Sequence, residues 1–171
     1  MKEVRPTTGK TLGALFSILG PLQGKAFLDL FSGTGRVAGE ARKRGASIVT
    51  VELVRERALD IKRSLGDRDH VQLCMDVRRG LSWVEKHGMC FDVIFADPPY
   101  EMKWMSELPG ILALHRAVLK PGGVVILERA QKEPLLLEDS SPWVLYDERR
   151  YGISVLDFLK LKEQGGSDVQ A

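Results

Sequence analysis

The residues best suited to chemistry directly follow a short apolar run. The segment from Phe91 to Tyr100 reads Phe-Asp-Val-Ile-Phe-Ala-Asp-Pro-Pro-Tyr, and its apolar half is typical of a strand buried on both faces. The strand must end at Asp97, because Pro98 and Pro99 have no backbone N–H with which to continue a sheet. The sequence therefore predicts a rigid polar hook, Asp97–Tyr100, at the edge where open α/β sheets keep their ligands.

The hook suits a planar base that carries an exocyclic amino group. The Asp97 carboxylate and the Pro98 carbonyl can accept the two N–H groups of the amine, while the Tyr100 ring stacks on the base. The same residues would also serve as a plain strand end followed by a turn and a surface tyrosine. Because Asp-Pro-Pro-Tyr directly follows a buried strand, the functional interpretation is favoured. We predict that Asp97, Pro98, Pro99 and Tyr100 form the catalytic site.

A glycine-rich loop predicts a second ligand site after an earlier strand. Ala26–Phe31 is expected to be that strand, and Ser32-Gly33-Thr34-Gly35 separates it from a helix that begins near Arg36. Glycines let the backbone turn tightly, and they let a ligand lie against the N-terminus of the helix that follows. The loop is therefore expected to hold a nucleoside or a related cofactor.

Three acidic residues narrow the identity of that cofactor. Asp29, Glu52 and Asp76 lie at or near the carboxyl ends of the first three strands, so all three can face one crevice. Glu52 follows the glycine loop at the spacing expected of a residue that accepts hydrogen bonds from ribose hydroxyls. Asp76 can accept from an adenine amino group. The Asp29 carboxylate would attract an ammonium group and repel a phosphate. S-adenosylmethionine uses all three carboxylates.

The glycine pattern by itself also fits a dinucleotide. A chain of 171 residues has no room for the substrate domain of a dehydrogenase, and no His or Tyr-Lys pair is placed for hydride transfer. The sequence therefore favours S-adenosylmethionine over a nicotinamide cofactor.

Length and composition indicate an ordinary globular protein. Of the 171 residues, 44% are hydrophobic and 28% are charged. We expect one domain over residues 1–162, with 1–22 as an N-terminal extension and helix, and a disordered tail over 163–171. The net charge of +2 produces no global basic field, so a nucleic-acid partner must be held locally. Neither a signal peptide nor a membrane-length apolar run is found, which predicts a cytoplasmic protein.

Cysteine and histidine usage gives no sign of a metal site. Cys74 and Cys90 lie beside predicted strands without metal-ligand spacing, so both are expected to be reduced, semi-buried thiols. His70, His87 and His115 are scattered and are expected at the surface or at helix ends.

Alternating apolar patterns predict the elements that position these groups. Strands are expected over 26–31, 48–52, 71–75, 93–96 and 124–128, and helices over 12–19, 36–44, 54–65, 77–87 and 109–119. This alternation is typical of an α/β fold with an open, mostly parallel sheet, right-handed crossovers and helices on both faces. Residues 143–149 and 153–162, on either side of the turn-forming Tyr151-Gly152, are expected to add a hairpin at one edge.

Together these motifs resemble the class I S-adenosylmethionine-dependent methyltransferases. More narrowly, they resemble the RsmD-like family of bacterial enzymes, which methylate the N2 amine of a guanine in 16S ribosomal RNA. The resemblance covers nearly the whole chain and rests on Arg5-Pro6-Thr7-Thr8, Leu15-Phe16, Leu28 to Gly35, Glu40-Ala41, Arg44-Gly45-Ala46, Val51-Glu52, Asp92 to Tyr100, Leu119 to Gly123 and Tyr151-Gly152. Asp-Pro-Pro-Tyr alone is less specific, because DNA adenine methyltransferases look similar there.

The resemblance implies a Rossmann-like, seven-stranded sheet whose last strand is antiparallel. It also implies that the substrate is 16S ribosomal RNA, within the small subunit or an assembly intermediate, and we expect a monomer. The residues expected to bind S-adenosylmethionine are Asp29, Phe31, Ser32, Gly33, Thr34, Gly35, Glu52, Leu53, Asp76 and Val77.

Basic residues near the crevice are the candidate RNA contacts. They share positions in loops or at the ends of elements, where they can meet phosphates without reading sequence; they are Arg5, Lys10, Arg36, Lys103, Arg129 and Lys132. Three alternatives stay open: methylation of DNA adenine or another amine, a non-catalytic assembly factor that binds the cofactor, and, more remotely, a nicotinamide enzyme.

Overall fold

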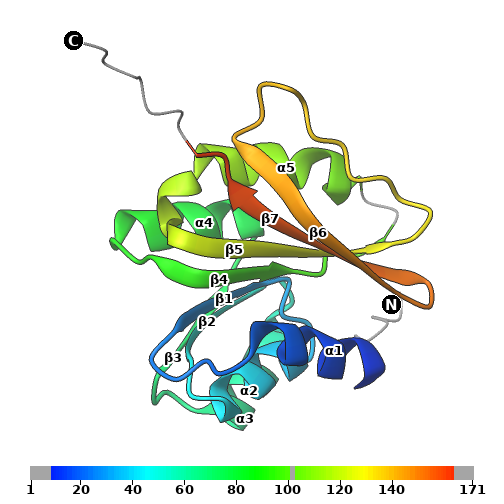
Figure 1. Ribbon diagram of the computed structural model, residues 1–171. Coiled ribbons are helices and arrows are strands. Elements are labelled where there is room, and N and C mark those ends of the chain that lie inside the picture. The colour runs from blue at the N-terminus through cyan, green and yellow to red at the C-terminus, as the bar shows by residue number, and fades with distance from the viewer. Residues whose placement is uncertain (1–8, 101–102, 164–171) are drawn as a thin grey trace.

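A seven-stranded sheet runs through the middle of the molecule (Figure 1). The computed structural model describes residues 9–100 and 103–163. The strand order is β3-β2-β1-β4-β5-β7-β6, and β7 runs antiparallel to both of its neighbours. The strands are β1 (Ala26–Leu30), β2 (Ser47–Glu52), β3 (His70–Cys74), β4 (Phe91–Ala96), β5 (Leu119–Ala130), β6 (Trp143–Tyr151) and β7 (Ser154–Leu161). The predicted mostly parallel sheet with an antiparallel C-terminal hairpin is confirmed.

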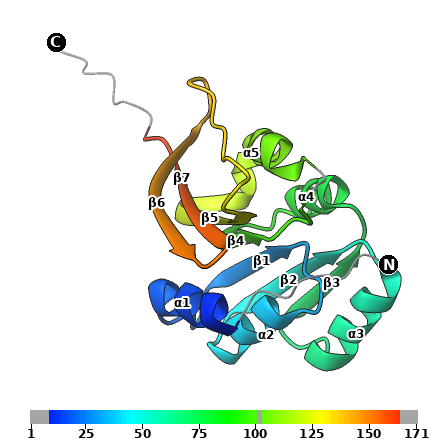
Figure 2. The same ribbon diagram turned by 90° about the vertical axis from the view of Figure 1, so that its right-hand side faces the viewer.

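Helices cover both faces of the sheet, as predicted (Figure 2). One face carries α1 (Gly9–Leu19), α2 (Arg36–Lys43) and α3 (Arg55–Leu65), and the other carries α4 (Val77–Lys86) and α5 (Trp104–Leu114). Side chains of β1 alternate between the two layers: Phe27 packs with α1 and α2, whereas Leu28 and Leu30 pack with α4 and α5. This period of two is what a strand buried on both faces requires.

The last helix begins earlier than its sequence predicts. A helix was expected to open at Pro109, but α5 begins at Trp104 and contains Pro109 in its interior, while a 3₁₀ helix covers Arg116–Val118. Pro109 cannot donate a helical hydrogen bond, yet Met105, Leu108 and Leu112 are buried on the same helix. Burial of this face outweighs the lost hydrogen bond.

Two expectations about cysteine and histidine are wrong. Cys74 and Cys90 are free but exposed, not semi-buried. His70 is buried at the start of β3, where Nε2 lies 2.7 Å from Thr50 Oγ1 and Nδ1 lies 2.8 Å from the Gly66 carbonyl. Burial lowers the pKa of His70 below its usual value. His87 and His115 do lie at helix ends, directly after α4 and α5.

The described residues contain neither a candidate membrane-spanning helix nor a candidate metal-binding cluster. None of its helices is long and apolar enough to cross a membrane. Within residues 9–100 and 103–163, no three His, Cys, Asp or Glu side chains gather where they could hold a metal ion.

A buried ion pair joins the C-terminal hairpin to β5. Arg129 donates from Nε to Asp157 Oδ2 at 2.5 Å and from Nη2 to Glu148 Oε2 at 3.0 Å, and its Nη1 donates to the Glu133 carbonyl. Arg129 is 7% exposed and Asp157 is 0% exposed. The guanidinium was expected to contact RNA, but it is occupied inside the protein, so we withdraw Arg129 from the candidate RNA contacts.

Replacing Asp157 by alanine is expected to lower the free energy of unfolding by about 3–5 kcal/mol, because it leaves a buried guanidinium without its main counter-ion. The measurement is urea-induced unfolding of both proteins. Asp147→Ala is the matched control, since its partner Arg149 is exposed, and such solvent-exposed pairs contribute little to stability. Equal losses in the two variants would show that the buried pair does not hold the hairpin.

Candidate active site

The strand pairing brings the hook and the glycine loop to the same edge of the sheet. Leu30 at the end of β1 pairs with Ala96 at the end of β4 and with Val51 of β2. The glycine loop, Phe31–Gly35, and the hook, Asp97–Tyr100, therefore start side by side. Parallel strands end together at this edge, which is where ligands bind in open α/β sheets.

Ser32 connects the glycine loop to β1 and β2 by hydrogen bonds. Its backbone N–H donates to the Val51 carbonyl at 2.9 Å, and its hydroxyl donates to the Asp29 carbonyl at 2.8 Å. The same hydroxyl oxygen accepts from the Val51 N–H at 3.2 Å. The loop therefore has a defined shape in the described structure.

Gly35 occupies a position that strongly favours glycine. Its φ is +75°, and a Cβ atom there would lie 3.0 Å from Ile61 Cγ1 of α3. Glycine adopts this left-handed backbone without steric cost. Its lack of a side chain also allows close packing of α2 against α3.

Glu52 holds the glycine loop in addition to any role with a ligand. Its Oε2 accepts from the Gly33 N–H at 2.8 Å, and its Oε1 accepts from the Val54 N–H at 2.8 Å. Each oxygen keeps a second lone pair that can accept from a hydroxyl. The residue expected to contact ribose thus also couples the end of β2 to the loop.

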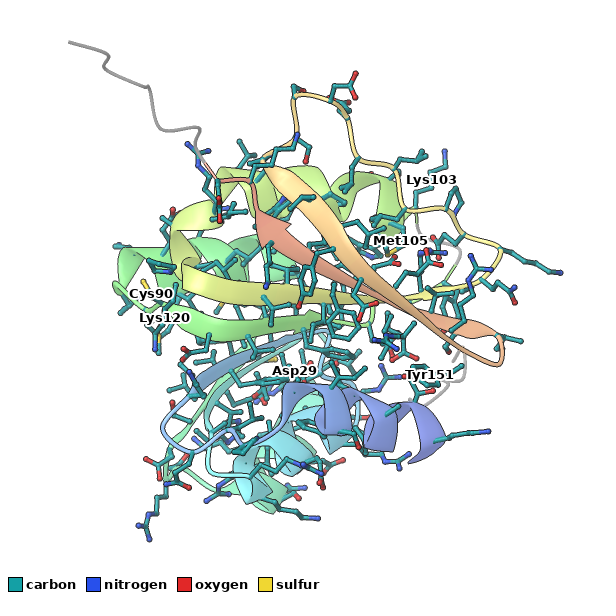
Figure 3. All side chains as sticks on the ribbon, in the orientation of Figure 1. Asp29, Cys90, Lys103, Met105, Lys120 and Tyr151 are labelled. Carbon is teal, nitrogen blue, oxygen red and sulfur yellow. The ribbon has the colours of Figure 1, made fainter. Side chains whose placement is uncertain are left out.

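Asp29 is the most unusual ionisable group at this edge. Its side chain is 1% exposed, and among the described residues Oδ2 has no hydrogen-bond partner. Burial raises its pKa to about 8; the Ala38 backbone N–H opposes this shift, and the Glu52 charge adds to it. In Figure 3, Asp29 lies between the sheet and the helices beneath it.

The orphaned oxygen of Asp29 provides a test of whether this site fits the expected cofactor. A buried carboxylate is costly unless a cation or donors satisfy it. The ammonium group of an amino acid would supply both a charge and N–H donors. A buried carboxylate oxygen without a partner therefore fits the ammonium group at the amino-acid end of S-adenosylmethionine.

Asp76 and Leu53 provide a polar and an apolar group beside β3. Asp76 caps α4, because its Oδ1 accepts from the Arg78 N–H at 2.9 Å. Leu53 follows β2 and is 67% exposed, whereas the expected cofactor residue Val77 is buried. An exposed leucine and a carboxylate with spare lone pairs are what the face and the amino group of an adenine require.

The hook follows β4 as its sequence predicts. β4 ends at Ala96, and no regular element includes Asp97, Pro98 or Pro99. Pro98 is buried, Asp97 and Tyr100 are half-buried, and Pro99 is exposed. The carboxylate and the ring are thus both accessible from the sheet edge.

The candidate RNA contacts lie on several elements. Lys10 is in α1, Arg36 opens α2, Lys103 precedes α5 and Lys132 follows β5, and all four are exposed. Arg5 lies outside the described residues.

Arg78 and Trp104 were not expected at this site. The guanidinium carbon of Arg78 lies 4.5 Å from the Trp104 ring centroid, and Arg78 Nη2 donates to Glu107 Oε2 at 2.6 Å. The Phe31 ring meets Trp104 edge to face, with centroids 4.9 Å apart. No local sequence spacing signals these contacts, because the partners come from three different strand ends.

Comparison with solved structures defines the class of fold. A hypothetical protein from Thermus thermophilus is 27% identical with a TM-score of 0.78, over 94% of this chain and 91% of that one. SMU.776, whose structure was solved in complex with S-adenosylhomocysteine, is 18% identical with a TM-score of 0.67, over 89% of this chain and 49% of that one. The strand order and these likenesses define a class I S-adenosylmethionine-dependent methyltransferase fold.

The chain belongs to the family described as Conserved hypothetical protein 95, whose model matches residues 1–160. Ribosomal RNA small subunit methyltransferase D of Buchnera aphidicola is 25% identical over 150 residues, which are 86% of this chain and 77% of that protein. YlbH of Bacillus subtilis is 29% identical over 158 residues, which are 89% of this chain and 85% of that protein. The RsmD-like resemblance is confirmed at the level of family.

Proposed function

We propose that this protein is an S-adenosylmethionine-dependent methyltransferase that modifies the exocyclic N2 amine of a guanine in 16S ribosomal RNA. The observation that carries the cofactor assignment is the buried Asp29 with its unpartnered Oδ2 beside the glycine loop. The names of the ribosomal RNA methyltransferases among the relatives support the substrate class. The Asp-Pro-Pro-Tyr hook supports transfer to an amine.

The cofactor site in this proposal uses five groups of the chain. Asp29 accepts from the ammonium group, and the glycine loop lies against the amino-acid part. The free lone pairs of Glu52 accept from ribose hydroxyls. Asp76 accepts from the adenine amino group while Leu53 packs on the ring. Bound S-adenosylmethionine supplies a methyl group on a sulfonium centre that is already electrophilic.

The hook positions the amine in this proposal. The guanine is unstacked from the RNA and placed at the sheet edge, where Tyr100 stacks on it. Asp97 and the Pro98 carbonyl accept from the two N–H groups, so the nitrogen lone pair is directed at the methyl group. The methylated amine is strongly acidic and loses a proton late, to Asp97 or to water. Asp97 therefore acts mainly by orientation.

RNA phosphates are proposed to meet the exposed basic residues around the same edge. Lys10, Arg36, Lys103 and Lys132 supply positive charge without sequence information. Specificity for one guanine then depends on the shape of the RNA or of the assembling subunit.

The test is transfer of labelled methyl from S-adenosylmethionine to three substrates: small ribosomal subunits that lack the modification, naked 16S RNA, and DNA. The modified nucleoside is identified after digestion. The proposal predicts N2-methylguanine from a ribosomal substrate. Methyladenine in DNA would show that the substrate is DNA and not ribosomal RNA. Tight cofactor binding without any transfer would favour a non-catalytic assembly factor.

A further inference from the structure

The half-buried Trp104 ring is contacted by a residue of the glycine loop and by a residue of α4, both beside the proposed cofactor site. Trp104 is the first residue of α5, the helix that follows the hook. Phe31 belongs to the glycine loop after β1, and Arg78 belongs to the first turn of α4 after β3. The two contacts on Trp104 therefore join the ends of three strands, β1, β3 and β4.

The Arg78 guanidinium is fixed by carboxylates on both sides of this junction. Its Nη2 donates to Glu107 Oε2 of α5 at 2.6 Å, and its Nη1 lies 3.7 Å from Asp76 Oδ2. A guanidinium above an indole face is attracted by the ring electrons in addition to these charges. Arg78 thus links the proposed adenine acceptor, Asp76, directly to the start of α5.

Phe31, the second residue in contact with Trp104, has a constrained backbone conformation. Phe31 has a φ of 62°, a left-handed conformation that bulky residues rarely adopt. Such a conformation persists only where the surroundings over-determine it. The edge-to-face contact with Trp104, at 4.9 Å between centroids, is one of those constraints.

In sequence, the hook lies between β4 and α5, and each of these elements has a described contact near the proposed cofactor site. Ala96, the last residue of β4, pairs with Leu30 of β1. Trp104, the first residue of α5, packs against Phe31 and Arg78. Lys103 and Met105 flank Trp104 in sequence. Figure 3 labels both, and they lie together on the side of the molecule where α5 begins. Both elements that flank the hook in sequence are therefore tied to the proposed cofactor site, β4 through β1 and α5 through Phe31 and Arg78.

We propose that Trp104 is a positioning residue, which aligns the Asp97–Tyr100 hook with the cofactor site through its contacts with Phe31 and Arg78. This inference rests on the proposed function. Occupation of the glycine loop and of Asp76 would fix Phe31 and Arg78, and through them Trp104. Substrate amine and cofactor would thereby be held in register for transfer.

The test compares Trp104→Leu, Trp104→Phe and Arg78→Met with the wild-type protein. We expect Trp104→Leu to lower kcat for methyl transfer about tenfold or more, with a smaller rise in KM for the RNA, because alignment and not encounter is lost. Trp104→Phe keeps an aromatic face and should recover kcat to within about threefold of wild type. Affinity for S-adenosylhomocysteine is measured separately by calorimetry.

Trp83→Leu is the matched control, because Trp83 of α4 is also half-buried but stacks on His87, the residue directly after that helix. It is expected to shift Tm as Trp104→Leu does while kcat changes less than about twofold. Equal kcat losses in the two leucine variants, or a normal kcat in Trp104→Leu, would overturn the inference.

The Arg78→Met variant keeps the test decisive if Trp104→Leu does not fold. The Arg78 side chain is 49% exposed, so its truncation is tolerated, and we expect a severalfold loss of kcat. A normal kcat in that variant overturns the inference. If the wild-type protein is active and the variants are unaffected, the inference is wrong but the proposed function stands. If the wild-type protein does not bind S-adenosylhomocysteine, both are wrong.

Discussion

Replacing Asp97 by alanine is expected to lower kcat for methyl transfer about 10²–10³-fold, because the amine loses the acceptor that orients it. Affinity for S-adenosylhomocysteine should change less than about threefold, since other loops are proposed to bind the cofactor. The measurement is single-turnover transfer at saturating cofactor, together with a calorimetric titration. Near-normal turnover with unchanged cofactor affinity would remove Asp97 from the catalytic site.

Asp97→Asn separates orientation from proton transfer. Asparagine keeps one oxygen acceptor but cannot take a proton. If orientation dominates, this variant should lose only about tenfold in kcat and clearly exceed the alanine variant. An asparagine variant as inactive as the alanine variant would instead assign the carboxylate the role of an essential base.

Replacing Asp29 by asparagine is expected to weaken cofactor binding at least about 10²-fold, because the variant cannot neutralise a buried ammonium group. The same substitution should change how stability depends on pH. The pKa of Asp29 is raised from 3.8 to about 8 by burial, with Glu52 adding to the shift. Calorimetric titration with S-adenosylhomocysteine measures the first effect.

The sign of the stability effect follows from the raised pKa. The folded protein keeps a proton on Asp29 that the unfolded chain releases above its own pKa of 3.8. Stability from this group is therefore fully present below pH 3.8 and is lost as pH rises toward about 8, by at most about 1.4 kcal/mol per pH unit. Asparagine does not titrate, so the free energy of unfolding of the variant minus that of wild type should rise between pH 5 and 8 and level off above.

Urea unfolding of both proteins across this pH range measures that slope. A difference independent of pH would show that Asp29 is ionised in the folded, ligand-free protein. Proton release on cofactor binding provides an independent check: at pH 7 the wild-type binding enthalpy should depend on the buffer, and that of Asp29→Asn should not.

Much of the fold could be predicted because its signals are local. Strand ends are marked by polar or prolyl residues, such as Asp97 after β4, and the two-residue period within β1 separates Phe27 from Leu28. The start of α5 could not be predicted, because burial of Met105 and Leu108 overrides the helix-breaking tendency of Pro109. His70 was misplaced because its partner Thr50 lies on a neighbouring strand.

The candidate site could be predicted only in part for the same reason. The spacing of Asp29, Glu52 and Asp76 follows from the strand-loop-helix repeat, so their common edge was foreseeable. The contact of Trp104 with Phe31 and Arg78 depends on how the glycine loop and the first turns of α4 and α5 meet in space. Likewise, Arg129 is buried by Asp157, a residue on another strand, and nothing in the sequence around Arg129 indicates it.

The most direct measurement is a crystal structure of the protein with S-adenosylhomocysteine. The central claim predicts the ligand at the carboxyl edge of the sheet, with its amino nitrogen within about 3.2 Å of an Asp29 carboxylate oxygen and its sulfur facing the hook. The opposite edge offers a contrasting location, since Ser47, His70 and Cys90 line a cavity of about 350 Å³ there. A ligand bound at that edge, or one whose ammonium group avoids Asp29, would contradict the account.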